Sequence, residues 1–433
     1  MANSYLEANM TGNTASTKMT FSCWIKINKV DEDGRIFGAQ ANACHAYFNG
    51  DGRLNIDFAA KDSSSVSAKL LTNRKFRDPN AFYHIVFALD TTLGTADDRI
   101  KLWVNGVQET AFDTRTNPGQ NDTYAYGQSG YYNVGARSNN TGSAGHYFEG
   151  YISHAAYVDG SALAPTVFGQ TDSTSGIWKF KSPTGVTWGD NGFHLKFENS
   201  GNLGLDSSGE GNNFTTNGNL KQAIDNPSNS YATINPLDYW YRNPVLSIGN
   251  TKIVDTTGWS GARSTFGFST GKWYWEIKLS GSSMDNHIHG VQLVDVNTRT
   301  QDPQQITGTT VFYNHDGGEM RTDGTQTTAD YGTFSSGDIM GVAVDMTAGS
   351  YGQITIYKNG SAIVSNFNLS SSSTTVMPFS AVGNCTTEYN FGNGLFGTTA
   401  ITSAGSNGNG SLFEYDVPSG HYALNTKNLN TYG

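Results

Sequence analysis

The sequence predicts an all-β protein built as two β-sandwich domains joined by an irregular connector. The chain has 433 residues, which is long for one domain and suits two of about 200 residues each. Aromatic residues make up 12% of the chain, charged residues only 15%, and there are 51 glycines. Aromatic strand formers combined with many turn formers are typical of short β-strands, and this composition excludes a helical protein rich in Ala, Leu, Glu and Lys.

The first half of the chain is predicted to be a series of β-strands separated by turns. Residues 20–30 alternate with period two, so that Phe21 and Ile25 face away from Trp24. The turn residues Asn-Gly-Asp-Gly at 49–52 predict a hairpin, because Gly and Asn adopt positive φ at little cost. Further strands are expected at 81–90, 99–108 and 147–163.

The character of the sequence changes between residues 201 and 242. This stretch is rich in Asn, Ser and Gly with scattered prolines, and we interpret it as a connector between a first domain at 1–200 and a second at 243–433. A second series of β segments then begins at Val245. Turn signals separate these segments at short intervals, which favours another sandwich.

Charge and hydropathy exclude two classes of partner. The net charge is −10, and neither half carries the basic stripe that phosphate contacts require, so we expect no nucleic acid. No run of 18 apolar residues is present, so we expect no insertion into a membrane. The N-terminus lacks a cationic segment followed by an apolar one, which indicates synthesis in a cytoplasm without a secretion signal.

A set of short sequence motifs in the first half of the chain resembles the motifs of the laminin-G or concanavalin A-like jelly roll. The resemblance spans roughly residues 4–200 and implies a jelly-roll sandwich there. The residues that occupy the places of the family's motifs are Tyr83, His84, Val104, Asn105, Gly106, Phe148, Gly150, Ile152, Asp159, Ala162 and Leu163.

The second half resembles a SPRY domain. GKWYWEIKL at 271–279 is similar to the opening strand of that family, GDIMGVAVDMTAG at 337–349 to a later strand, and ITIYKNG at 354–360 to its hairpin. The resemblance extends over about residues 245–430 and implies a SPRY-like sandwich.

The order of these two domains resembles a group of proteins encoded by bacteriophages. Members of that group are usually virion proteins, such as tail fibres or other surface appendages. The resemblance implies a protein made in the host cytoplasm and located in the virion, with other virion proteins and a host-surface glycan or receptor as partners. It also implies a homo-oligomer, which we expect to be a trimer.

Two alternatives to host recognition stay open. The first is a capsid or tail decoration protein with an assembly role only. The second is a glycan-cleaving tailspike, but the sequence holds no acidic string of the kind that glucanases use, no nucleophile elbow and no phosphate-binding loop. We therefore expect a protein that is not an enzyme.

Aromatic residues in polar loops are the candidate ligand-binding residues. We expect them to be exposed, because an aromatic side chain in a polar loop has no evident core to fill, and flat aromatic faces stack on sugar rings. The alternative is that these loops pack on their own sandwich or on another subunit. The candidates are Tyr124, Tyr126 and Tyr131 in the first domain and Trp259, Tyr313 and Asp316 in the second.

Two groups of residues are candidate metal ligands. His287 and His289 are two apart on a predicted strand and so share a face, and such pairs around a threefold axis could bind a metal octahedrally. Asp206 and Asn212 lie in an oxygen-rich, glycine-containing string that suits Ca²⁺, which many laminin-G-type jelly rolls carry at their rim. The alternatives are an ordinary strand edge for the histidines and a tight turn at Asp206. Calcium is therefore the one cofactor considered.

Overall fold

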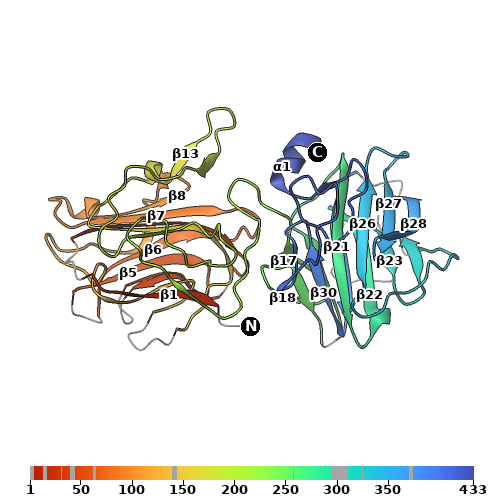
Figure 1. Cartoon of the computed structure of the whole chain (residues 1–433), viewed down its shortest axis with the longest axis horizontal. Coiled ribbons are helices and arrows are strands. Elements are labelled where there is room, and N and C mark those ends of the chain that lie inside the picture. The colour runs from red at the N-terminus through yellow and green to blue at the C-terminus, as the bar shows by residue number, and fades with distance from the viewer. Residues whose placement is uncertain are drawn as a thin grey trace. The chain divides into compact units, whose positions relative to one another are not determined.

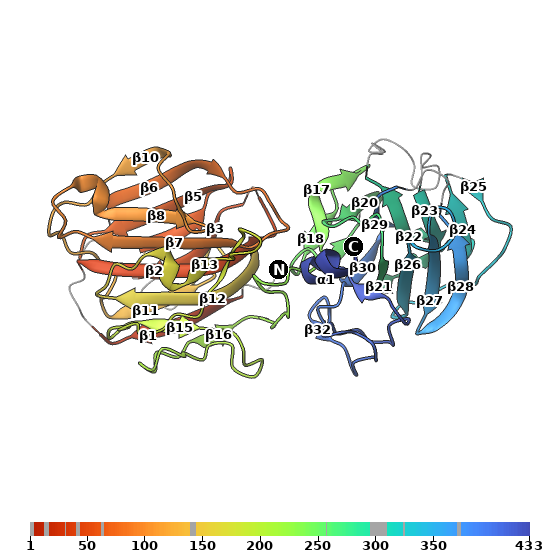
Figure 2. The ribbon, with the colours of Figure 1, turned by 90° about the horizontal axis from the view of Figure 1, so that it is seen from above.

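The computed structural model describes the chain except for residues 1–3, 13–16, 31, 40–43, 62–64, 139–143, 257, 295–309, 324 and 370–373. The chain divides into two compact units, Met1–Gln222 (unit 1) and Ala223–Gly433 (unit 2). Each unit consists of stacked, largely antiparallel sheets, as Figures 1 and 2 show. The prediction of an all-β protein made of two sandwiches is confirmed.

Unit 1 contains two large sheets and one small one. Its eight-stranded sheet comprises, in spatial order, β10 (Phe112–Thr116), β6 (Val66–Lys75), β5 (Arg53–Ala59), β4 (Cys44–Phe48), β3 (Gly34–Ala39), β11 (Gly130–Val134), β1 (Tyr5–Met10) and β16 (Thr215–Asn217). Its six-stranded sheet comprises β15 (Phe193–Leu195), β12 (Gly150–Asp159), β2 (Lys18–Ile27), β7 (Tyr83–Asp90), β8 (Ile100–Val104) and β9 (Val107–Gln108). The small sheet pairs β13 (Gly169–Thr171) with β14 (Trp178–Phe180), and the 3-10 helices are η1 (Ala96–Asp98) and η2 (Pro165–Val167).

The core of unit 1 lies between the two large sheets. Phe21 and Ile25 of β2 point into it and are fully buried, as the period-two pattern predicts. A segment that we name the strap, residues 160–192, covers the outer face of the six-stranded sheet (Figures 1 and 2). Phe168 and Trp188 of the strap pack there in one apolar cluster with Ala156 and Val158 of β12.

Unit 2 also stacks two large sheets. The seven-stranded sheet comprises β17 (Ile234–Trp240), β20 (Trp259–Ser264), β29 (Val376–Gly383), β22 (His287–Leu293), β23 (Thr310–Asn314), β24 (Glu319–Thr322) and β25 (Thr325–Gln326). The other sheet comprises β18 (Val245–Ser247), β19 (Lys252–Val254), β30 (Cys385–Asn390), β21 (Lys272–Gly281), β26 (Ile339–Asp345), β27 (Gln353–Lys358) and β28 (Ser361–Asn368), with β33 (Tyr422–Ala423) parallel to β21. Smaller elements are η3 (Met284–Asn286) and the pair β31 (Leu395–Phe396) and β32 (Thr399–Ala400).

An α-helix, α1 (Thr426–Tyr432), lies at the C-terminal end of unit 2, and sequence analysis did not predict it. Asn425 caps it, because its side-chain oxygen accepts a hydrogen bond from the Asn428 amide at 2.9 Å. Among the described residues, no helix is long and apolar enough to cross a membrane.

The stretch that sequence analysis assigns to the connector, residues 201–242, is divided between the units. Strand β16 pairs with β1, and Phe214 is buried in the core of unit 1. Strand β17 pairs with β20 in unit 2. The division between the units falls between these two strands, at Gln222 and Ala223.

We expect limited trypsin digestion to cut first after Lys221. This lysine is exposed and adjoins the boundary between the units, and proteases cut most readily in exposed chain between compact units. Mass spectrometry should find two stable fragments that separate at this bond, and Lys221→Gln should delay their formation. Early cuts inside either sandwich would contradict this division of the chain.

Candidate functional site

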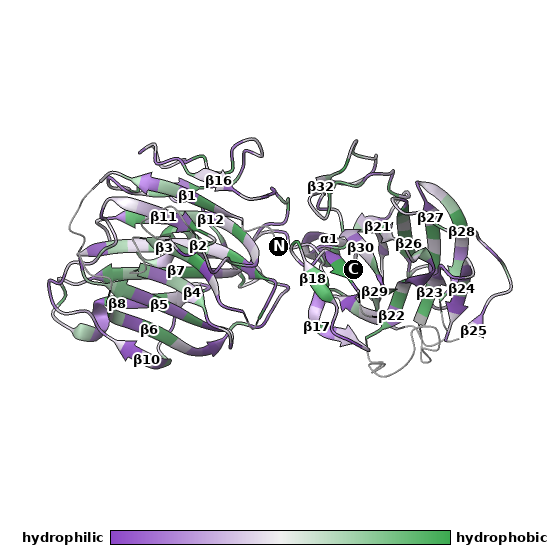
Figure 3. Cartoon of the chain, turned by 90° about the horizontal axis from the view of Figure 1, so that it is seen from below, coloured by the Kyte–Doolittle hydropathy of each residue, from purple (hydrophilic) through white to green (hydrophobic). Residues whose placement is uncertain are grey.

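The two sheets of unit 1 differ in what covers their outer faces. The strap covers the six-stranded sheet, and side chains there such as Thr20, Ser22 and Lys26 are buried. The outer face of the eight-stranded sheet carries polar side chains between its core-facing residues, and Figure 3 shows this mixture along the strands. This second face is the candidate site.

Cross-strand pairing places polar residues of this face in one line, which we name the polar row. In order across β6, β5, β4, β3, β11 and β1 it consists of Lys69, Asp57, His45, Gly38, Asn133 and Glu7. The neighbouring residues Ala46 and Ile56 belong to the core, so strand alternation turns the row outward. Asn55, two residues before Asp57, lies on the same face.

Several polar atoms at the row are buried without a hydrogen bond. The side-chain oxygens Asn55 Oδ1, Asn133 Oδ1 and Glu7 Oε2 accept none from the described residues, and His45 Nε2 has no partner there either. Buried polar atoms are nearly always paired, and each unpaired one costs about 1–3 kcal/mol. Three of these four atoms are oxygens, so the row contains acceptors that have no donor among the described residues.

Two cations of this face, Arg35 and Lys69, are paired with carboxylates. The Arg35 guanidinium lies 3.6 Å from the centre of the Tyr47 ring and forms an ion pair with Asp33. Lys69 Nζ lies 3.5 Å from Asp57 Oδ1. Tyr47 and Lys69 are partly exposed, and the acceptors of the row belong to strands.

Burial shifts the pKa of two ionisable members of the row, His45 and Glu7, towards the neutral form of each side chain. It lowers the pKa of His45 to about 3, and the nearby charges of Arg35 and Arg137 add to this effect. It also raises the pKa of Glu7, against the opposite effect of a hydrogen bond with Asn133. His45 is therefore a neutral hydrogen-bonding group of the row.

A short segment that follows β11 crosses the row at Gly38. A Cβ atom on Gly38 would lie 2.7 Å from the Ser138 amide nitrogen and 3.2 Å from the Ala136 carbonyl oxygen. Ser138 Oγ fastens this segment by donating to the Tyr131 carbonyl at 2.7 Å. Glycine is thus required at position 38, and the segment separates Asn133 and Glu7 from the half of the row that contains His45 and Asp57.

Family comparison agrees with this architecture. Residues 1–167 match the concanavalin A-like lectin/glucanases superfamily, and residues 272–394 match the SPRY domain. The chain contains both domains. The polar row lies in the concanavalin A-like domain, on strands within its matched range, and no curated protein matches the sequence.

Solved structures resemble parts of the chain at low identity. The SPRY domain of human HERC1 matches 36% of this chain and 96% of its own, with 16% identity and a TM-score of 0.30. The carbohydrate binding module CBM66 from Bacillus subtilis matches 34% of this chain and 86% of its own, with 11% identity and a TM-score of 0.25. Domains LG4-5 of the mouse laminin alpha1 chain match 89% of this chain and 84% of their own, with 10% identity and a TM-score of 0.29.

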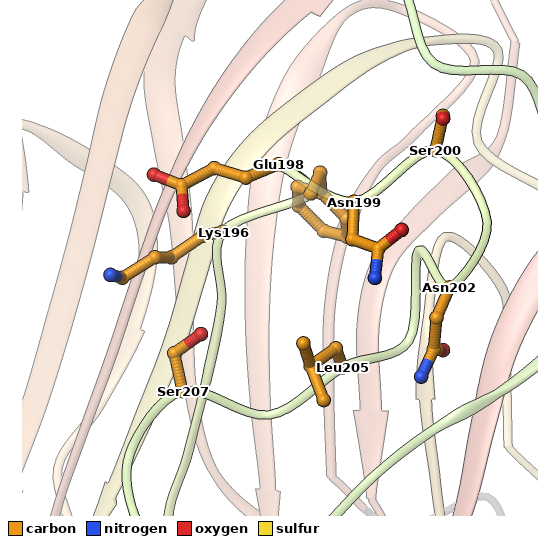
Figure 4. A pocket seen from close by; sticks show the side chains of 8 residues that line it. Lys196, Glu198, Asn199, Ser200, Asn202, Leu205 and Ser207 are labelled. Atoms are coloured by element: carbon orange, nitrogen blue, oxygen red, sulfur yellow. The ribbon is translucent and has the colours of Figure 1, made fainter.

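A separate pocket of about 370 Å³ lies in the loop that follows β15 (Figure 4). Phe197 there has a φ of 60°, which a bulky residue rarely adopts, and Gln222 Nε2 holds its carbonyl oxygen at 2.7 Å. The lining residues are Lys196, Phe197, Glu198, Asn199, Ser200, Asn202, Leu205 and Ser207, and most are exposed. Hydrated groups of this kind bind a ligand less strongly than desolvated ones, so the polar row stays the candidate site.

The prediction that loop tyrosines of the concanavalin A-like domain are exposed is wrong for Tyr124 and Tyr126. Both are fully buried, and their ring centres lie 5.7 Å and 5.3 Å from that of Phe58. Pairing of Ala125 with Ala59 draws this segment between the sheets, where large rings fill the space. Tyr131 is partly exposed on β11 and points to the same side as Asn133.

The three candidates of the SPRY domain do not form one group. Tyr313 is fully buried in the core between the sheets, so its expected exposure is also wrong. Trp259 is half-buried and packs on a cluster at the other face of the seven-stranded sheet, beside Trp240 and Phe312. Asp316 is exposed in the turn that joins β23 to β24.

The residues around Asp206 do not fit a calcium ion. The two carboxylate oxygens accept hydrogen bonds from four donors, namely the amides of His194, Ser208 and Asn212 and the Ser208 hydroxyl. Calcium needs six to eight oxygen ligands, whereas N–H and O–H groups surround this carboxylate. Across the described parts of the chain, no cluster of three or more His, Cys, Asp or Glu side chains could hold a metal.

His287 and His289 are buried inside the SPRY domain and therefore cannot meet at a symmetry axis. His289 Nε2 lies 3.3 Å from His287 Nδ1, and its Nδ1 lies 2.8 Å from Ser380 Oγ. Burial lowers the pKa of His287 to about 4 and that of His289 still further. The prediction that His287 and His289 share one face of their strand is correct, but this face of β22 points into the core and not to solvent.

Sequence reasoning missed the polar row although one signal for it was present. The turn at 49–52 joins β4 to β5, and counting back from it places His45 opposite Asp57 and Tyr47 opposite Asn55. Polar residues at every second position of both strands then indicate a polar outer face. Asn133 and Glu7 carry no such signal, because β11 and β1 join the sheet from distant parts of the chain.

Proposed function

We propose that this protein is a bacteriophage virion surface protein that recognises a neutral, hydroxyl-rich glycan through the polar row and does not cleave it. The observation that carries the proposal is the set of buried acceptors without donors at Asn55, Asn133 and Glu7. Sugar hydroxyls are donors that would satisfy them. The match of residues 1–167 to a superfamily described as lectins and glucanases supports the same ligand class.

The charges of the molecule favour a neutral ligand over an acidic one. The net charge is −10, and the unpaired atoms of the row are mostly oxygens, which repel carboxylate or sulfate groups. Lys69 and Arg35, two cations near the row, are already paired with Asp57 and Asp33. A ligand that brings hydroxyl donors therefore fits better than one that brings negative charge.

The spacing of the acidic groups in the row argues against glycan cleavage. Asp57 and Glu7 lie four strands apart, which corresponds to about 19 Å at the usual spacing between strands. Glycoside hydrolases place their two carboxyl groups about 5–9.5 Å apart.

The virion context rests on the order of the two domains described above. A surface location would give the polar row access to host glycans, and the SPRY domain and the outer edges of the sheets would then contact other virion proteins. We expect a homo-oligomer, because exposed sheet edges such as β10 and β28 are commonly covered in assemblies.

The test is an array of neutral and acidic glycans probed with the whole chain and with Asn55→Ala. Loss of an unsatisfied buried acceptor should leave the melting temperature unchanged or slightly raised. It should weaken glycan binding by at least about tenfold, because a ligand hydroxyl loses its partner. Asn73→Ala is the matched control, since this asparagine of β6 is exposed.

Three results would count against the proposal. Absence of binding to any glycan would favour the assembly-only alternative. Equal binding by the native chain and Asn55→Ala would place the site elsewhere. Release of reducing sugar from a bound polysaccharide would favour the tailspike.

A further inference from the structure

The strap is fastened to unit 1 by three aromatic side chains that each stack on a histidine of the six-stranded sheet. Trp178 stacks on His84 with ring centres 6.0 Å apart, and Phe180 on His154 at 3.6 Å. Trp188 stacks on His194 at 5.6 Å. The three histidines belong to three different strands, β7, β12 and β15.

His84 is held in one neutral tautomer. Trp178 Nε1–H can only donate, and it lies 2.9 Å from His84 Nδ1, so that nitrogen accepts the hydrogen bond. His84 Nε2 therefore carries the proton and donates to Ser22 Oγ at 2.9 Å. A second proton on the imidazole would have to replace the bond to Trp178.

His154 and His194 lie close together under the rest of the strap. Their ring centres are 5.9 Å apart, so two positive charges there would repel each other. His154 lies at the β-bulge of β12 with a φ of 48°, and its Nδ1 has no partner within the described chain. Burial lowers the pKa of His84 to about 3 and the pKa values of His154 and His194 to about 4.

The charged groups around the histidines mostly oppose protonation. Lys196, just after β15, disfavours the charged forms of His154 and His194, and His154 acts in the same way on His84. Asp206 favours a charged His194, but its oxygens already accept four hydrogen bonds. Within the strap, Asp172 is neutralised by an ion pair with Lys179.

We propose that the strap is an acid-sensitive cover, which detaches from the six-stranded sheet when His84, His154 and His194 are protonated. Detachment would break the Trp178 hydrogen bond and the three ring stacks. It would uncover His84, on which the nearly buried Trp24 also stacks with ring centres 4.5 Å apart. This inference does not depend on glycan binding, which uses the opposite sheet.

The direction of the effect follows from the protonation states. The closed strap holds the histidines neutral, whereas an open strap lets them protonate near the ordinary pKa of about 6.5. Closure is therefore fully stabilised above pH 6.5 and is weakened as the pH falls towards 4. For each pH unit by which the pH falls in this window, each histidine raises the equilibrium constant for opening of the strap about tenfold. The three histidines together raise it about a thousandfold per pH unit.

The experiment is ¹⁹F NMR on the whole chain labelled with 5-fluorotryptophan. The Trp178 resonance is assigned with Trp178→Phe. As the pH is lowered from 6.5 to 4, we expect this resonance to move to the chemical shift of a solvent-exposed indole. The pH dependence of the shift should show that the protein takes up more than one proton in this transition. The far-ultraviolet circular dichroism and the resonances of Trp273 and Trp275 in the core of unit 2 should stay constant over the same range.

His84→Asn provides the matched variant, because asparagine keeps an oxygen acceptor near the Nδ1 position and does not titrate in this range. In this variant, opening of the strap should occur at lower pH and with uptake of fewer protons. His146→Asn changes an exposed histidine outside the strap contacts and should behave like the native chain. The proposal is overturned if the Trp178 resonance moves only at a pH at which the β-sheet signal in the far-ultraviolet circular dichroism is also lost. If His84→Asn does not fold, the native chain alone still tests the proposal. A shift of its Trp178 resonance that takes place without uptake of protons would overturn it.

Discussion

Tyr126→Ala should destabilise unit 1 by about 3–5 kcal/mol, the usual cost of removing a large aromatic side chain from a core. Tyr126 is 0% exposed, and its ring lies between Phe37, stacked at 5.8 Å, and Phe58, edge-on at 5.3 Å. Urea denaturation followed by tryptophan fluorescence measures the loss. An aromatic that instead stacked on a ligand would lose binding at an unchanged melting temperature.

Tyr126→Phe is the control for this substitution. The Tyr126 hydroxyl is buried, and no described residue hydrogen-bonds to it. Phenylalanine keeps the ring and removes the unpaired hydroxyl, so stability should be unchanged or slightly higher. If Tyr126→Ala were as stable as the native chain, the core position of this residue would be wrong and the original expectation of an exposed loop tyrosine would return.

Glu276→Ala should destabilise unit 2 by about 3–5 kcal/mol, because this carboxylate fastens the C-terminal segment to β21. Glu276 is 0% exposed and accepts hydrogen bonds from the amides of Glu414 and Tyr415, both at 2.8 Å. Tyr274 Oη and Asn390 Nδ2 donate to it at 3.2 Å and 3.3 Å. Without the carboxylate, two backbone N–H groups lose their partner, and each costs about 1–3 kcal/mol.

Glu276 also makes the stability of unit 2 depend on pH. Burial raises the pKa of its carboxyl to about 7, against the lowering effect of the four donors. The folded state thus binds more protons than the unfolded state above the ordinary pKa of about 4.3, so this residue's contribution falls as the pH rises from there through 7. Glu276→Gln should flatten this part of the stability profile.

Thermal unfolding at several pH values checks the Glu276 prediction. Glu388→Gln is a suitable control, because Glu388 is a partly exposed carboxylate of the neighbouring strand β30 and pairs with Lys252. Its effect should be at most about 1 kcal/mol. A Glu276→Ala protein as stable as this control would show that the C-terminal segment is held by its apolar contacts alone.

The strands of the second domain show how far periodicity reaches. In GKWYWEIKL the alternation separates Trp273 and Trp275 from Tyr274 and Glu276, and the structure confirms this separation. Periodicity does not say that both faces of β21 are buried. The second face is covered by Phe413 and Val417, which come from a part of the chain more than 130 residues away.

The candidate sites show the opposite case. Tyr124 and Tyr126 lie in a segment without a strand pattern, and their burial depends on the pairing of Ala125 with Ala59, which local sequence does not reveal. The polar row could be predicted in part, since a recognisable turn sets the register of β4 and β5. Its continuation through Gly38 to Asn133 and Glu7 could not, because β11 and β1 come from parts of the chain that are distant in sequence from each other and from β4 and β5.

The sequence by itself determined the fold class, the two domain types and the strand faces, because these depend on composition, local motifs and the period-two geometry of a β-strand. The tertiary structure alone decided which faces are covered. It buried the predicted tyrosines Tyr124, Tyr126 and Tyr313, enclosed His287 and His289, and placed three histidines under three aromatic rings of the strap. The physical reason is that a side chain's orientation is set by its own backbone, whereas its environment is set by strands and loops distant in sequence that pack against it.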